Sequence, residues 1–176
     1  MKNTKGFTLV ELLAVIVIMG ILMMVAIPAV SRTIENTRKD SFVNTAKNYA
    51  NAALTQWTAD GFSCTIGSES ITSSAVPNGT YYIQINTKDA NAPELLQQGG
   101  KSPWGNRDVA GWVKVVVSTG SGDKRVEKFY VNIGDSAHAI KVDKEYSSLV
   151  RGDITSIAKE AENPSIPPAG IKCVEQ

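Results

Sequence analysis

A long apolar run near the N-terminus limits the possible folds of this chain more than any other feature. Residues 7–30 carry a single charged side chain, Glu11. About 20 apolar residues are enough to cross the roughly 30 Å hydrocarbon core of a bilayer as a helix. A charged side chain costs roughly 2.5–3.5 kcal/mol near the centre of such a span, so it usually has a partner and a role. We therefore expect a membrane-spanning helix with a functional acid near its start.

The partner expected for Glu11 is an amino group four residues upstream. Cleavage between Gly6 and Phe7 would leave a free α-amino group on Phe7, which is largely charged at neutral pH. Lys2 and Lys5 precede the apolar run and predict that this end of the chain stays on the cytoplasmic side. The residues after the run would then lie outside the cytoplasm.

Residues 1–30 resemble the leader and N-terminus of type IV prepilins and the related pseudopilins. The features that match are Lys2, Lys5, Gly6 before the cut, Phe7 after it, Thr8, Leu9, Glu11 and the apolar stretch to Val30. The resemblance implies cleavage after Gly6 by a membrane-embedded prepilin peptidase and N-methylation of Phe7. Glu11 could pair with its own Phe7 amine or with that of a neighbouring subunit. The resemblance favours the neighbour, and implies that this pair sets the register of each subunit as it is added to the filament.

Two other kinds of N-terminal segment fit this sequence less well. A secretory signal peptide would be cleaved beyond its apolar core, but Pro28 interrupts the small residues there and the run is long for a signal core. An uncut signal anchor suits the length of the run. It leaves Glu11 without its amine partner and gives Gly6 and Phe7 no role.

The helix is predicted to continue beyond the apolar run. Residues 31–59 contain neither glycine nor proline, and Asp60 and Gly61 supply a stop. One apolar stripe follows the helical period and is expected to pack on a sheet; its members are Phe42, Ala46, Tyr49, Ala50, Ala53 and Trp57.

Gly20 and Pro28 weaken the first half of this helix. Proline removes one helical hydrogen bond, and glycine is about 1 kcal/mol worse than alanine in a helix. The stretch between them is the expected place for a kink or for local unwinding, and the sequence leaves both open.

Beyond residue 60 the sequence predicts a single β-rich domain. Strands are expected at 80–85, 111–118 and 124–133, with a hairpin turn at 119–123 and a possible fourth strand at 138–142. Residues 62–79 read as an irregular connector, and residues 154–162 as a short helix capped by Asp153. The fold class is α+β: a pilin-like roll in which one long N-terminal helix packs on an antiparallel sheet of three to four strands. The domains are a cleaved leader (1–6), the helix (7–60, with 7–30 membrane-spanning and polymerising) and an extracytoplasmic domain (61–176).

The chain has two cysteines, Cys64 and Cys173. Outside the cytoplasm such a pair predicts one disulfide that ties the tail to the base of the domain. Two free, buried thiols are the alternative.

Little in the sequence indicates an active site. His138 has no evident nucleophile beside it and is expected at the surface or at a strand edge. Residues 102–106 (SPWGN) resemble a turn of major pseudopilins and some pilins. This predicts either a tight turn anchored by a half-buried Trp104 or a calcium-linked loop. The loop fits less well, because Asp108 is the single acid close by in sequence. No cofactor, metal or direct nucleic-acid site is expected, because the net charge is +1 without a basic run.

The function expected from the resemblance is structural, not enzymatic. The chain would be a type IV pilin that polymerises into a surface filament for adhesion, motility or biofilm formation. Its partners would be copies of itself, the membrane before assembly, the prepilin peptidase and an assembly platform. The alternatives are a pseudopilin of a secretion or DNA-uptake machine and a membrane-anchored binding module that never polymerises.

Overall fold

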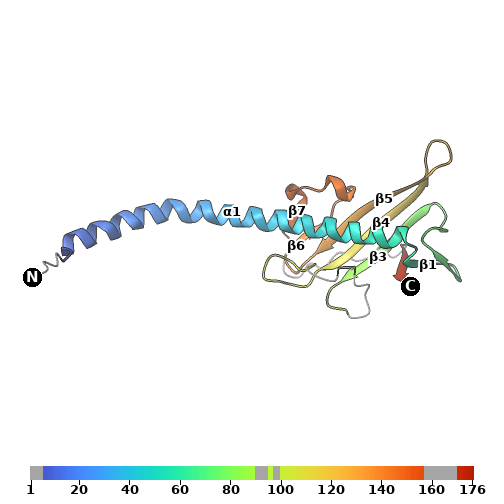
Figure 1. The fold of residues 1–176 in the computed structure, drawn as a ribbon, viewed down its shortest axis with the longest axis horizontal. Coiled ribbons are helices and arrows are strands. Elements are labelled where there is room, and N and C mark those ends of the chain that lie inside the picture. The colour runs from blue at the N-terminus through green and yellow to red at the C-terminus, as the bar shows by residue number, and fades with distance from the viewer. Residues whose placement is uncertain (1–5, 90–94, 97–99, 157–169) are drawn as a thin grey trace, which may run out of the picture. The chain divides into compact units, whose positions relative to one another are not determined.

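The structure is a computed structural model that describes residues 6–89, 95–96, 100–156 and 170–176. The chain divides into two compact units, Met1–Thr37 and Arg38–Gln176. One continuous helix, α1 (Leu9–Thr58), belongs to both units. The first unit consists of the N-terminal half of α1, and the second contains the rest of α1 and all of the strands (Figure 1).

Within the described residues, eight strands form one sheet. Its order is β2-β1-β8-β3-β4-β5-β6-β7, and every neighbouring pair is antiparallel except β3 and β8, which are parallel. Two short 3-10 turns, η1 (Tyr146–Ser148) and η2 (Arg151–Asp153), separate β6 from β7. The strands are β1 (Phe62–Ile66), β2 (Glu69–Thr72), β3 (Gly79–Asn86), β4 (Ala110–Thr119), β5 (Arg125–Gly134), β6 (His138–Ile140), β7 (Ile154–Ser156) and β8 (Ile171–Glu175).

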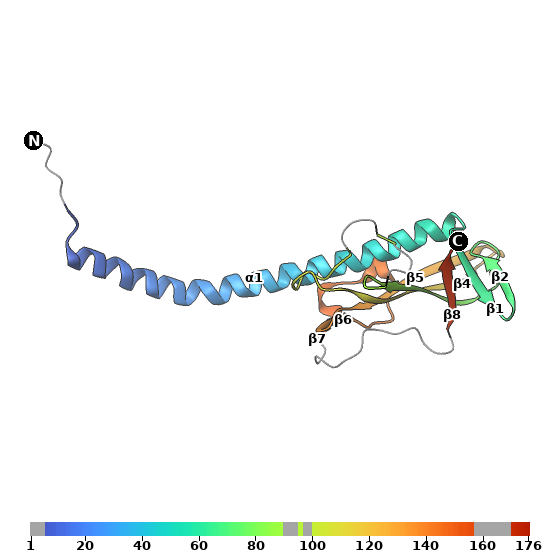
Figure 2. The same ribbon diagram turned by 90° about the horizontal axis from the view of Figure 1, so that it is seen from below.

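From Arg38 onward, α1 lies against one face of this sheet (Figure 2). The predicted apolar stripe is confirmed, because all six of its residues are buried, and Val43 joins them. Opposite the helix, the inward side chains of β3, β4 and β5 complete one core; they include Ile83, Val113 and Val131. Trp57 lies at the centre of an aromatic cluster, with ring centroids 5.8 Å from Tyr81 and 6.5 Å from Phe129.

The α+β, pilin-like layout and the three long predicted strands are confirmed. The sheet is larger than expected and it is mixed, because β8 enters it parallel to β3. The predicted fourth strand is present as the short β6. The predicted edge position of His138 is wrong, since β6 lies between β5 and β7.

The irregular connector predicted at 62–79 is wrong for its first half. Residues 62–72 form the β1–β2 hairpin, in which Phe62 and Cys64 point into the core. Gly67 turns the chain with a φ of 65°, a left-handed conformation that glycine adopts without a steric penalty. The serines and threonines that suggested a loop lie on the exposed side of these strands, where threonine is a favourable strand residue.

The prediction of a helix from residue 154 is also wrong for its first three residues. Ile154–Ser156 is strand β7, paired with β6, and the side chain of Ile154 is buried. Asp153 does act as a cap, but for the 3-10 turn η2, of which it is the last residue: its carboxylate accepts the N–H of Val150 at 2.9 Å. The rest of the predicted helix lies outside the described residues.

Candidate functional site

The N-terminal end of α1 is closed by a reciprocal pair of side chains. The backbone N–H of Thr8 donates to Oε2 of Glu11 at 2.8 Å, and the Thr8 hydroxyl donates to the same oxygen at 2.7 Å. In return, the N–H of Glu11 lies 3.3 Å from the Thr8 hydroxyl oxygen. This is a capping box, which satisfies N–H groups that have no partner inside a helix. Glu11 is thereby held in a fixed position one turn from the Gly6–Phe7 bond.

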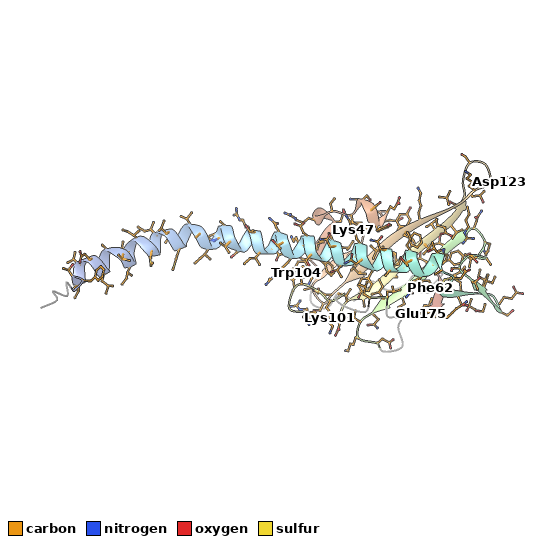
Figure 3. All side chains as sticks on the ribbon, in the orientation of Figure 1. Lys47, Phe62, Lys101, Trp104, Asp123 and Glu175 are labelled. Carbon is orange, nitrogen blue, oxygen red and sulfur yellow. A yellow bond between two sulfur atoms is a disulfide. The ribbon has the colours of Figure 1, made fainter. Side chains whose placement is uncertain are left out.

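The side chains that follow Glu11 are exposed all round the helix (Figure 3). Phe7 is 92% exposed, Met24 is 77% exposed, and even Ile34, beyond the apolar run, is 47% exposed. Within the described residues, α1 is the one helix long and apolar enough to cross a membrane, and its apolar window is not buried. A helix that is apolar on every face needs lipid or other protein around it.

Gly20 and Pro28 both lie inside α1, and the helix is unbroken at each of them. A Cβ added at Gly20 would meet nothing within 4 Å. Packing within the single subunit therefore does not require glycine at this position. Kinking or unwinding between these two positions stays a prediction about the assembled state.

Residues 1–27 match a known sequence family, the prokaryotic N-terminal methylation motif. The chain is prepilin-like. The motif supports a protein of the type IV pilin and pseudopilin kind, and it indicates a structural subunit rather than a known enzyme family. It also suggests processing by a prepilin peptidase and assembly into a filament. No curated protein and no solved structure matches the chain.

The cysteine pair lies in the second unit, outside the matched residues. Cys64 on β1 and Cys173 on β8 are direct neighbours in the sheet and form a disulfide. The predicted pairing therefore fits the structure. Both residues are buried, with exposed fractions of 0% and 2%. The bond ties the C-terminal strand of this prepilin-like chain to the first strand after α1.

The predicted turn at residues 102–106 is anchored more firmly than the sequence suggested. Trp104 is buried rather than half-buried, with 7% exposed. Its ring stacks on His138 at 3.8 Å between centroids and meets the edge of Phe42 at 5.5 Å. Asp108, the acid nearest to the turn in sequence, lies 3.4 Å from the ammonium of Lys101. Among the described residues, no group of three or more acidic, histidine or cysteine side chains could hold a metal ion.

A buried carboxylate, Asp135, holds this turn to the β5–β6 connection. Its Oδ2 accepts the Ser102 hydroxyl at 2.5 Å, and its Oδ1 accepts the N–H groups of Ala137 and His138, each at 2.6 Å. Burial raises the pKa of Asp135, but these three hydrogen bonds and the nearby imidazole together hold it below its ordinary value. The group is therefore a structural anion at neutral pH.

Thr8 and Asp135 are the residues whose structural roles were not predicted. The capping role of Thr8 could have been found, because Thr8 and Glu11 have the T-x-x-E spacing of a capping box ahead of an apolar run. Asp135 carries no comparable signal, since it is one acid in a G-D-S loop and its donors come from residues up to 33 positions away.

Proposed function

We propose that the protein is the structural subunit of a type IV pilus, which polymerises through the first half of α1 into a surface filament for adhesion, motility or biofilm formation. The observation that carries the proposal is the exposed apolar surface of residues 7–30, with one capped carboxylate at its start. Lipid covers this surface before assembly, and copies of the same surface cover it afterwards.

Processing begins with the leader, residues 1–6. The prepilin peptidase cuts between Gly6 and Phe7 on the cytoplasmic side, and the new Phe7 amine is methylated. The resulting cation and Glu11 are the two charges at the membrane-embedded end of the helix. Pairing of Glu11 with the Phe7 amine of a neighbouring subunit fixes the register of the added subunit, because an unpaired charge in an apolar surrounding is costly.

Glu11 is well placed for this pairing. The hydrogen bonds donated by the N–H and the hydroxyl of Thr8 both end on Oε2, and they hold the side chain at the start of the helix. The residues beyond α1, 61–176, form the extracytoplasmic domain that the filament would display. Localisation thus changes from a single-pass membrane subunit to a cell-surface filament.

A pseudopilin of a secretion or DNA-uptake system is the second candidate. The anchored turn at residues 102–106 favours it, because a P-W-G turn at this place resembles one in major pseudopilins. Both candidates share the helix and the processing step, and they differ in where and how far the filament extends.

The direct test is to shear filaments from cells and to identify their subunit by mass spectrometry and electron microscopy. We expect long surface filaments whose subunit begins at a methylated Phe7. Short filaments confined to the cell envelope would favour the pseudopilin, and a subunit that begins at Met1 or beyond Val30 would contradict both. In Gly6→Ala, uncut protein should stay in the membrane without filaments, whereas Gly61→Ala, outside the leader, should leave the cut unchanged.

A further inference from the structure

The last strand of the chain fills an interior position in the sheet. β8 lies between β1 and β3, antiparallel to the first and parallel to the second. It is anchored along its length: Cys173 is bonded to Cys64, Gln56 donates to the carboxylate of Glu175 at 3.3 Å, and the N–H of Gln176 donates to the carbonyl of Gly61 at 2.9 Å.

Without β8, the sheet would separate into two parts. In the described residues, the sheet neighbours of β1 are β2 and β8, so β8 is what joins the β1–β2 hairpin to β3 and the rest of the sheet. Its removal would leave a slot with two bare strand edges, and such edges bind extended chain segments readily. We use the term β8 slot for this position between β1 (Phe62–Ile66) and β3 (Gly79–Asn86).

The β8 slot must exist in an open form at some stage. Both sulfur-bearing residues are buried in the finished domain, so an oxidant in solution does not reach them once β8 is seated. Oxidation therefore accompanies or precedes the final seating of the strand. Because β8 follows the other described strands of this sheet in sequence, the slot is filled after them during synthesis.

The connection before β8 is longer than the crossing to its own slot requires. From β7 to β8 the sheet order crosses five strand spacings, or about 24 Å. Residues 157–170 provide fourteen residues for this connection, whose maximum reach is about 50 Å. The length of the connection therefore does not confine the strand to the slot of its own chain.

We propose that the β8 slot is a strand-binding site that takes the C-terminal strand, residues 171–176, of a second copy of this chain. An exchanged strand makes the same contacts as the chain's own strand, so exchange between copies sacrifices no pairing in the sheet. The thiols of Cys64 and of Cys173 from the other chain then form a disulfide by exchange with a small disulfide such as oxidised glutathione, whose S–S bond breaks. Its two halves take up the two electrons and two protons and leave as two thiols. This inference does not depend on the proposed function.

One test uses full-length chains that cannot form the bond within themselves. Cys64→Ser and Cys173→Ser chains with different tags are co-expressed, so the Cys64–Cys173 bond can form only between chains. We expect a dimer that carries both tags on non-reducing gels, disappears with dithiothreitol and contains the Cys64–Cys173 linked peptide. Absence of this dimer would overturn the proposal.

A matched pair of substitutions separates strand insertion from random contact between thiols. Lys172 is exposed and lies in register with Tyr82 of β3. In the chain that keeps Cys173, Lys172→Pro should reduce the mixed dimer by about tenfold, because proline is not tolerated in an interior strand, whereas Lys172→Ala should not reduce it. Equal dimer from both variants would show that the thiols meet outside the slot.

A second measurement needs no substitution and so does not depend on how the variants fold. Purified ¹⁵N-labelled and unlabelled wild-type chains are mixed in detergent with reduced and oxidised glutathione, then digested without reduction. We expect Cys64–Cys173 peptides that join labelled to unlabelled chain, in a proportion that rises with protein concentration. Linked peptides from single chains alone, at every concentration, would contradict the proposal.

Discussion

The two halves of α1 have the same backbone and different surroundings. Up to Val30 the apolar side chains cover every face of the helix and are exposed; after Arg38 they form one buried stripe. In the second half the sheet of the same chain supplies the cover, and the remaining faces are polar. The first half has no such cover within its own unit. One continuous helix thus combines a part that is satisfied by folding with a part that is satisfied only by lipid or by other subunits.

If the two halves act independently, the largest effect should come from the charge in the first half. Glu11→Gln should still be cut and inserted, but filament yield should fall by about tenfold or more, because the Phe7 amine loses its partner in an apolar surrounding. Glu69→Gln, on the exposed strand β2, is the control and should assemble normally. Sheared filament protein measured against total membrane protein decides the outcome, and equal yields would remove Glu11 from the assembly step.

The next effect should appear in the stability of the second half alone. Phe42 is fully buried against Trp104, so Phe42→Ala should lower the free energy of unfolding of the second unit by about 3–5 kcal/mol. Leu22→Ala changes the same helix where the side chain is 64% exposed, and it should leave this stability unchanged. Denaturant unfolding of the full chain in detergent, followed by tryptophan fluorescence, measures both. A similar loss in the two variants would refute the division of the helix.

A smaller effect concerns the carboxylate that fastens the Trp104 turn. Asp135→Asn should reduce stability at pH 7 by about 1.5–3 kcal/mol, the usual range for hydrogen bonds to a charged group. The pKa of Asp135 in the folded chain lies below the ordinary value of 3.8, so the ionised form stabilises the fold above that pH and its contribution is lost as the pH falls further.

The advantage of wild type over Asp135→Asn should therefore shrink in acid. Thermal unfolding midpoints at pH 7 and at pH 3 test this, with Asp123→Asn in the exposed hairpin turn as the control. If the stability advantage of wild type grew toward pH 3, the ionised carboxylate of Asp135 would not be its cause.

The smallest effect should follow from stiffening the first half. Gly20→Ala should stabilise the helix locally by about 1 kcal/mol, and the added methyl group meets no atom within 4 Å. If the stretch from Gly20 to Pro28 unwinds in the filament, single-filament pulling should show lower extensibility for this variant and higher extensibility for Ala26→Gly. Identical force–extension curves would mean that this stretch does not unwind under load.

The parts of the fold that follow a strong period were predictable from the sequence. The stripe from Phe42 to Trp57 and the three long strands have unambiguous periods of about 3.6 and 2 residues. The start of the candidate site was equally accessible, because the apolar run and Glu11 are continuous in the sequence.

The parts that failed depend on pairing between distant residues. β1, β7 and β8 have three to five residues each, which is too short for a clear period, and each is a strand because of its neighbours. The parallel entry of β8 beside β3 joins segments separated by almost the whole domain, and no local pattern encodes it. The hydrogen bonds of Asp135 could not be predicted for the same reason, because only the completed sheet brings its partners together.

The continuity of α1 also has a mechanical consequence. A pull applied along the helix reaches the sheet through the side chains between Phe42 and Trp57, which are distributed along four turns of the same axis. Such a force acts in shear on all of these contacts at once and does not peel them one by one. The contacts between the sheet and the second half of α1 should therefore withstand tension along the axis far better than the same number of contacts loaded from one end.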